Sequence, residues 1–241
     1  MNAHRQTILI VCLFSVAMAI LESATVVYLR ALYYPNGFSV ALKIMDQRIM
    51  LTELVREAAT VVMLISIGLL AGKNGKDRFA YFLISFAVWD IFYYVGLKVF
   101  IDWPSSLLEW DILFLIPFTW LGPVLAPIIC SITMLVWAFV ILRSNKPIAR
   151  IVMLLILAGS AVVLYTFLRD YASILYSNGF FQNYSTLMQN KKFLDIASGY
   201  VPANYSWGIF VAGELLIVVG IIVDRAEVSR RFTSQAAPVI K

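Results

Sequence analysis

Three charged residues lie at the start of the second long apolar stretch of the chain, in the sequence L-T-E-L-V-R-E-A-A-T of residues 51–60. Glu53, Arg56 and Glu57 are spaced by three and four residues, so an α-helix would place them on one face. Acyl chains cannot solvate ionisable groups, and such groups inside a membrane span therefore indicate a partner, a polar cavity or a functional site. The chemistry that the chain can carry starts from this face.

Insertion energies exclude a lipid-facing position for all three charges. A charge at the centre of a membrane helix costs about 2.5–3.5 kcal/mol, whereas a strongly apolar residue returns about 0.3–0.6 kcal/mol. Three such charges cost about 7.5–10.5 kcal/mol, which exceeds what the apolar residues of one span return. The charges must therefore lie near the membrane surface, pair with one another or line a polar cavity.

Further carboxylates lie inside apolar stretches that are distant in the sequence. We expect an outward-opening polar pocket in which Arg56 pairs with one acid, either Glu22 or Asp90, and Asp90 could instead accept a hydrogen bond from a tyrosine. Such a pocket could bind a cation, relay protons or act as an acid and base on a lipid-like substrate. The alternative is an ion-pair network that only fixes helix register. The candidate pocket residues are Glu22, Glu53, Arg56, Glu57, Asp90 and Glu214.

Metal, redox and nucleophilic chemistry have little support. The one histidine, His4, cannot form a paired-imidazole haem site, and the carboxylates lack the spacing of a D-D-x-x-D or E-x-x-H motif. No metal and no cofactor is therefore expected. Ser105 and Ser106 have no histidine base and are expected to cap a turn. Cys12 and Cys130 both lie in apolar stretches and suggest no disulfide.

Composition identifies the class of protein. Of 241 residues, 61% are hydrophobic and 14% are charged, against about 45–50% and about 25% in soluble domains. Long apolar runs predict an all-α integral membrane protein, because a barrel would show alternating segments of about ten residues. We expect one transmembrane domain over residues 1–241, a single bundle of about six helices. The predicted spans are residues 7–29, 49–71, 79–100, 121–142, 151–168 and 206–223.

The distribution of Lys and Arg predicts the orientation. These residues are more frequent before the first span, after the second and fourth spans and after the last one than in the other loops. By the positive-inside rule, both termini are cytoplasmic and three loops are outside. The expected partner is the lipid bilayer, and no nucleic-acid partner is expected.

The outer loop between the third and fourth spans is expected to form a short interfacial or re-entrant helix. Asp102 would be its N-cap, and Pro104 would lie in its first turn. The apolar run that follows is too short to cross a membrane before Pro117. The last outer loop, residues 169–205, is long enough for a short helix or lid. The interfacial candidates are Trp103, Glu109, Trp110 and Asp111.

Three segments resemble a known group of proteins. W-D-I-F-Y-Y-V-G-L-K-V, W-P-S-S-L-L-E-W-D-I-L-F-L-I-P and P-V-L-A-P are similar to segments of an uncharacterised family of polytopic bacterial inner-membrane proteins. This resemblance implies a bacterial inner-membrane location and no known activity. Trp89–Asp90 also resembles the Trp-Asp pair of membrane-bound lycopene cyclase domains. The chain departs from their later carboxylate motif, because Phe118, Thr119 and Trp120 follow Pro117.

Three functions are compatible with these features, and the sequence does not decide whether the protein is an enzyme. The first is an intramembrane acidic pocket that binds or passes a small cation or proton-coupled solute. The second is an enzyme acting on an isoprenoid or other lipid, with Asp90, Glu22 and Glu57 as acid–base groups. The third is a non-catalytic accessory or assembly subunit with a partner in a membrane complex. The almost wholly apolar inner halves of the spans weaken a path through the protein.

Overall fold

Six long helices dominate the computed structural model, which describes residues 3–35, 37–38, 40, 46–116, 119–144, 146–180, 190–200, 202 and 204–235, with side chains except at 3, 47, 194 and 226–235. Each of the six is long and apolar enough to cross a bilayer, so this is a multi-pass membrane protein. The helices are α1 (Ala3–Tyr33), α2 (Gln47–Ala71), α3 (Gly75–Ile101), α4 (Leu125–Arg143), α5 (Arg150–Ser177), the short α6 (Lys191–Gly199) and α7 (Trp207–Gln235).

Each predicted span overlaps one of these helices, but the boundaries differ, most of all at the ends of α5 and α7, which extend to Ser177 and Gln235 beyond the predicted 168 and 223. The fourth helix begins at Leu125 instead of residue 121, because residues 120–123 belong to a strand. Pro127 then lies in the first turn of α4, where its missing N–H has no intrahelical partner to lose. The last helix begins at Trp207, one residue later than expected. The short helix α6 lies in the last loop, where the sequence left room for one.

The loop before α4 differs from the predicted interfacial or re-entrant helix. It contains an antiparallel hairpin of β1 (Trp110–Phe114) and β2 (Trp120–Pro123), in which Asp111 lies opposite Gly122. The sequence W-D-I-L-F favours a strand because it is rich in aromatic and β-branched residues. Gly122 lets β2 lie close to α5, since a Cβ there would meet the Phe167 ring at 3.0 Å. Pro117 lies outside the described residues.

Asp102 also has a different role from the predicted N-cap. It ends α3 in the left-handed conformation with φ 52°, and its N–H donates to the Lys98 carbonyl oxygen at 3.1 Å. The Lys98 ammonium lies 2.7 Å from the Asp102 carboxylate and donates to the Pro104 carbonyl oxygen at 3.1 Å. This hydrogen bond and charge hold the pKa of Asp102 below its usual value. Lys98 is thus held at the exposed end of α3.

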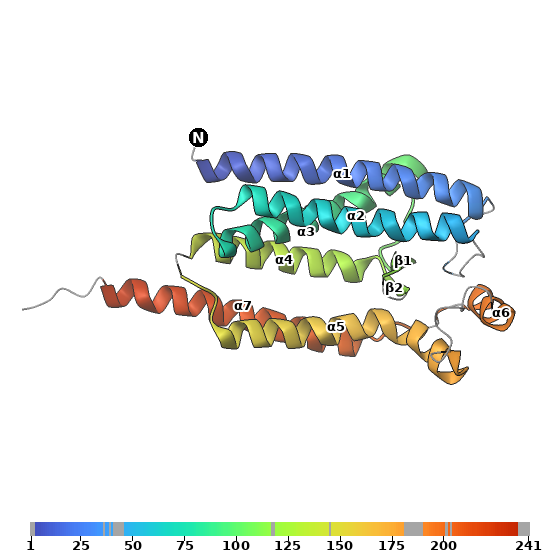
Figure 1. Ribbon diagram of the computed structural model, residues 1–241. Helices are drawn as coiled ribbons and strands as arrows, with labels where there is room; N and C mark the ends of the chain where they lie inside the picture. Colours follow the sequence, from blue (N-terminus) through green and yellow to red (C-terminus); the bar gives the residue numbers. More distant parts are fainter. Residues whose placement is uncertain are drawn as a thin grey trace, which may run out of the picture.

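The helices form two groups that lie side by side (Figure 1). In the first, α3 packs against α1, α2 and α4, and in the second α5 packs along α7. The second pair crosses closely at two glycines, because a Cβ on Gly159 would lie 2.6 Å from the Gly213 carbonyl oxygen. Helix α7 also contacts α4, and β2 contacts α5, so the hairpin bridges the two groups.

The two ends of the bundle differ in construction. We call the end that carries the start of α1 the terminal end, and the opposite end, with the hairpin and α6, the hairpin end (Figure 1). The main apolar core fills the terminal half, where Tyr81, Ile84, Trp137 and Val152 are buried together. Most of the buried charged side chains of the described residues, among them Arg30, Glu53, Glu57 and Asp111, lie instead toward the hairpin end, and the candidate site lies there.

Candidate functional site

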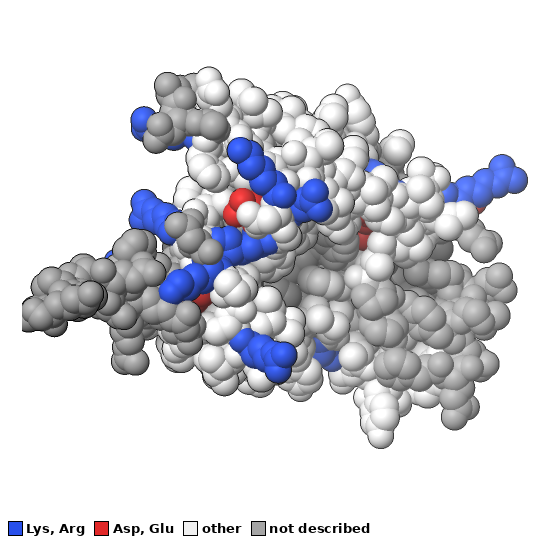
Figure 2. Space-filling view, turned by 60° about the vertical axis from the view of Figure 1, so that its left-hand side comes forward, with Lys and Arg blue, Asp and Glu red and all other residues white. Residues whose placement is uncertain are grey.

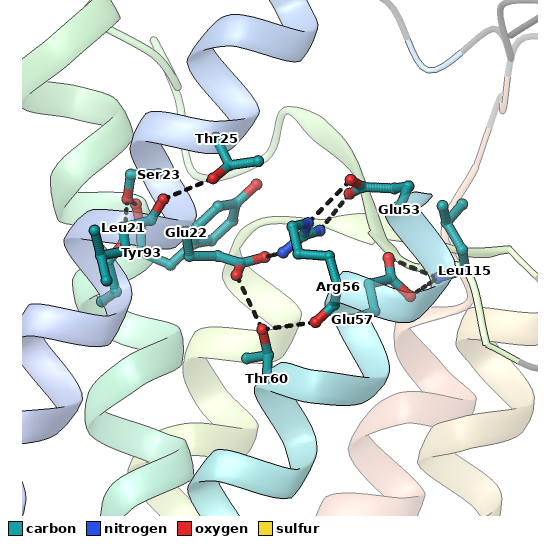
Figure 3. A network of polar contacts seen from close by, with 11 residues as sticks. Leu21, Glu22, Ser23, Thr25, Glu53, Arg56, Glu57, Thr60, Tyr93 and Leu115 are labelled. Atoms are coloured by element: carbon teal, nitrogen blue, oxygen red, sulfur yellow. Dashed lines mark hydrogen bonds and ion pairs between the residues drawn. The ribbon is translucent and has the colours of Figure 1, made fainter. Parts of the chain in front are cut away.

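Arg56 is the centre of an ion-pair cluster that joins α1 to α2 (Figure 3). Its guanidinium pairs with Glu22 of α1 and with Glu53, whose Oε2 accepts from Arg56 Nε at 2.9 Å. Thr60 Oγ1 donates to Glu22 Oε2 at 3.3 Å. The predicted pairing of Arg56 with Glu22 is confirmed, whereas the alternative pairing with Asp90 is not found. One guanidinium therefore serves two carboxylates.

Glu57 lies beside this cluster but faces a different partner. Both of its carboxylate oxygens accept from the Leu115 N–H, at 3.2 and 3.0 Å. Leu115 directly follows β1, so the hairpin is anchored on α2 (Figure 3). Glu57 is 7% exposed and makes no ion pair within the described part of the chain. The neighbouring Arg56 guanidinium is directed at Glu22 and Glu53 instead, so Glu57 has no direct cationic partner among the described residues.

Asp90 is held by a neutral group. Its Oδ2 accepts from Ser131 Oγ of α4 at 2.7 Å, which joins α3 to α4. Neither Arg56 nor a tyrosine, the two predicted partners, donates to it in the hydrogen bonds of the described residues. The adjacent Trp89 stacks on Tyr93 with ring centroids 6.4 Å apart. Asp90 is therefore a second carboxylate without a cation.

A second arginine, which sequence reasoning had counted only as a loop charge, lies in the last turn of α1. Arg30 Nη2 is 3.1 Å from Asp111 Oδ1, and the two side chains are only 9% and 2% exposed. The guanidinium carbon lies 3.8 Å from the ring centroids of both Phe38 and Trp103. Burial raises the pKa of Asp111 to about 6, although the Arg30 charge acts in the opposite direction. In the sequence, the position of Asp111 directly before the apolar run that begins at Ile112 indicates that this acid needs a buried basic partner.

The remaining candidates lie outside this group. Glu214 accepts from Thr133 Oγ1 at 2.9 Å and is buried between α4 and α7. Glu109 accepts from the Ser105 N–H at 3.2 Å and from its hydroxyl, so Ser105 closes a turn as expected. Trp110 packs edge-on against Tyr205, with centroids 5.8 Å apart. These contacts indicate structural positions.

A cavity of about 590 Å³ joins most of these groups. Its wall comes from the hairpin and from helices α1 to α6, and it includes apolar side chains such as Met50, Leu54 and Phe193. Five carboxyl groups and two guanidinium groups of the described residues line it: Glu22, Glu53, Glu57, Asp90, Asp111, Arg30 and Arg56. Glu214 is not among them. The sequence therefore located the acidic wall but not the Arg30–Asp111 pair within it.

Several buried polar atoms of the cavity wall have no hydrogen-bond partner among the described residues. They are Nε and Nη1 of Arg30 and the indole nitrogens of Trp89 and Trp120. Buried polar atoms normally have partners, supplied by protein, ordered water or a ligand. Their concentration around one cavity is typical of a cavity that holds ordered water or a polar ligand.

Metal binding is not favoured by the geometry. Within the described residues, no three His, Cys, Asp or Glu side chains are grouped so that they could hold a metal ion.

Comparison of the chain with protein-family models, with curated proteins and with solved structures finds no match. The function must therefore be argued from the cavity itself.

Proposed function

We propose that the protein binds, within the membrane, a small amphipathic molecule that carries a positive charge. The observation that carries this proposal is the excess of carboxyl over guanidinium groups in the cavity wall. Arg56 serves both Glu22 and Glu53, and Arg30 serves Asp111. Glu57 and Asp90 have only neutral donors. Buried carboxylates without a counter-charge take up either a proton or a cation.

The other walls suit the rest of such a molecule. Aromatic rings attract cations over their faces, with Trp the strongest, and Trp89, Tyr93 and Trp120 all line the cavity. Apolar side chains fill the space between these groups. Ligand sites in proteins typically measure about 300–1,000 Å³ and combine an apolar wall with a few polar groups. A cavity of about 590 Å³ is in this range.

The position of the cavity supports a ligand that is dissolved in the bilayer. Leu51 lines the cavity and is nevertheless 61% exposed on α2, a helix that crosses the membrane. The rim of the cavity therefore reaches the outer surface of the bundle at the start of this helix. Toward the terminal end, the apolar core around Trp137 and Val152 closes the bundle. This supports binding over passage, and an internal cavity favours a ligand over the role of an accessory subunit.

Binding of tetraphenylphosphonium, a lipophilic cation, to the protein in nanodiscs tests the proposal. We expect saturable binding that weakens by about tenfold or more in the variant Glu57→Gln/Asp90→Asn, because this variant removes the two carboxylates that have only neutral donors. A tenfold loss corresponds to about 1.4 kcal/mol of binding free energy. The matched control is Glu214→Gln, which removes a buried carboxylate outside the cavity and should bind like the wild type. Equal binding by wild type and double variant would overturn the proposal.

A further inference from the structure

A hollow at the terminal end has no part in the cavity described above. It measures about 340 Å³ and lies between the start of α1, the turn that joins α2 to α3 and the connection from α4 to α5. We propose that this hollow is a specific site for the phosphate-bearing head group of an anionic phospholipid. The proposal does not depend on the function of the main cavity.

Two lysines and a histidine line the hollow, together with one acid, Asp77, whose Oδ2 accepts from Asn74 Nδ2 at 2.8 Å. Lys76 Nζ donates to the Ser144 carbonyl oxygen across the hollow. A lysine ammonium has three N–H groups, so two remain for a ligand. The Lys146 backbone N–H donates to Ser144 Oγ at 3.2 Å, which fixes the loop that carries the second lysine. His4 is held by a hydrogen bond of 3.0 Å between its Nδ1 and the Tyr81 hydroxyl. The Lys76 ammonium, the Lys146 backbone and the His4 ring are thus each held by a hydrogen bond to the fold.

The surface around the hollow is strongly basic. Figure 2 shows Lys and Arg side chains gathered at this end with few acids among them. None of these bases makes an ion pair with a described residue. By the bounds of the helices, the described Lys and Arg side chains at this end are Arg5, Lys73, Lys76, Arg78, Arg143, Lys146, Arg150 and Arg225.

The hairpin end lacks this imbalance. There Lys98 pairs with Asp102 and Arg169 with Asp170, and the described bases Arg48, Lys191 and Lys192 are accompanied by the acids Asp46, Glu109 and Asp195. An anionic partner is therefore matched by charge to one end of the bundle only.

Depth in the membrane selects a lipid as the source of the phosphate. Leu70, near the end of α2, is 82% exposed, and Ile151, near the start of α5, is 53% exposed, so acyl chains reach both sides of the hollow. The lysines lie just beyond these apolar residues, where head groups lie. Basic pockets between membrane helices at this depth bind anionic head groups.

Lipid retention measured by native mass spectrometry tests the site. The protein in detergent is titrated with phosphatidylglycerol or phosphatidylcholine, and Lys76→Gln/Lys146→Gln is compared with Lys191→Gln/Lys192→Gln, which makes the same charge change at the hairpin end. We expect wild type and control to prefer phosphatidylglycerol, and the first variant to lose about tenfold or more of that binding. Lys146→Gln alone, which keeps the contact of Lys76 with Ser144, should lose several-fold.

Three outcomes would overturn the proposal. One is equal retention in all variants, and another is an equal loss in both double variants, which would show a general charge effect. The third is displacement of phosphatidylglycerol by inorganic phosphate at constant ionic strength, which would show that any phosphate fills the hollow. Retention that is lost only in the variants of Lys76 and Lys146, and that resists phosphate, supports a lipid site.

Discussion

The two arginines of the cavity wall have the same chemistry but different surroundings. Arg30 is 9% exposed, has one carboxylate partner and lies between two aromatic rings. Arg56 is 21% exposed and is shared by two carboxylates, with a third, Glu57, next to it in the sequence. The first cluster is neutral and closed, whereas the second has a surplus of negative charge.

Under the proposed function, this difference assigns a structural role to the first cluster and a binding role to the second. A closed, neutral pair can join α1 to the hairpin, but it offers a ligand little net charge. A cluster with too few cations for its acids attracts a further cation. Charge balance and exposure, more than residue type, therefore separate the two roles. The following experiments test that separation, starting with the largest expected effect.

Removal of one member of the closed pair should destabilise the protein strongly. Arg30→Met leaves Asp111 buried without its counter-charge, and breaking a buried pair in this way costs about 3–5 kcal/mol. The free energy of unfolding in mixed micelles would measure the loss. The double variant Arg30→Met/Asp111→Leu should recover most of it, because apolar replacement of a whole buried pair is often neutral. A loss below about 1 kcal/mol in the single variant would contradict the structural role.

The closed pair should also make stability depend on pH. The pKa of Asp111 is about 6 in the folded protein, against about 3.9 in an unfolded chain. Between these values the folded state binds more protons than the unfolded state, so stability falls as pH rises from about 4 to about 6 and is constant above. The expected total is about 3 kcal/mol. The difference between wild type and Asp111→Asn isolates it, and a difference that does not change over this range would contradict the burial of Asp111.

Removal of the shared arginine, Arg56, should destabilise the protein less than removal of Arg30. It should strengthen the binding of a cation, whereas removal of the acids Glu57 and Asp90 should weaken it. Arg56→Gln leaves Glu22 and Glu53 facing the cavity, where water can hydrate them or a proton can neutralise them, so we expect a loss of about 1–2 kcal/mol. The cavity becomes more negative, and tetraphenylphosphonium should bind about tenfold more tightly. The control is Arg169→Gln, an exposed arginine outside the cavity wall. Weaker binding in Arg56→Gln would show that the cluster does not attract cations.

The sequence predicts part of this comparison. The spacing of Glu53, Arg56 and Glu57 identified a charged helix face, and insertion energies required partners for it. The closed pair could not be found in the same way, because Arg30 is at a helix end, where a lysine or arginine normally reaches water. Its partner comes from the hairpin, and the short apolar run 112–116 had suggested a helix. Tertiary packing of α5 against Gly122, which no local pattern contains, selects the strand.

The smallest expected effect tests whether the two clusters are independent. Phe38→Leu removes one ring from Arg30, a loss of about 0.5–2 kcal/mol, and Thr60→Val removes the hydroxyl that donates to Glu22, a loss of about 0.5–1.5 kcal/mol. The described residues of the two clusters share no direct hydrogen bond or ion pair. Effects of residues without shared partners add to within about 0.3–0.5 kcal/mol. We therefore expect the double variant to lose the sum of the two single losses. A coupling energy above about 1 kcal/mol would mean that the cavity wall responds as one unit, and binding at the acidic cluster would then depend on the closed pair.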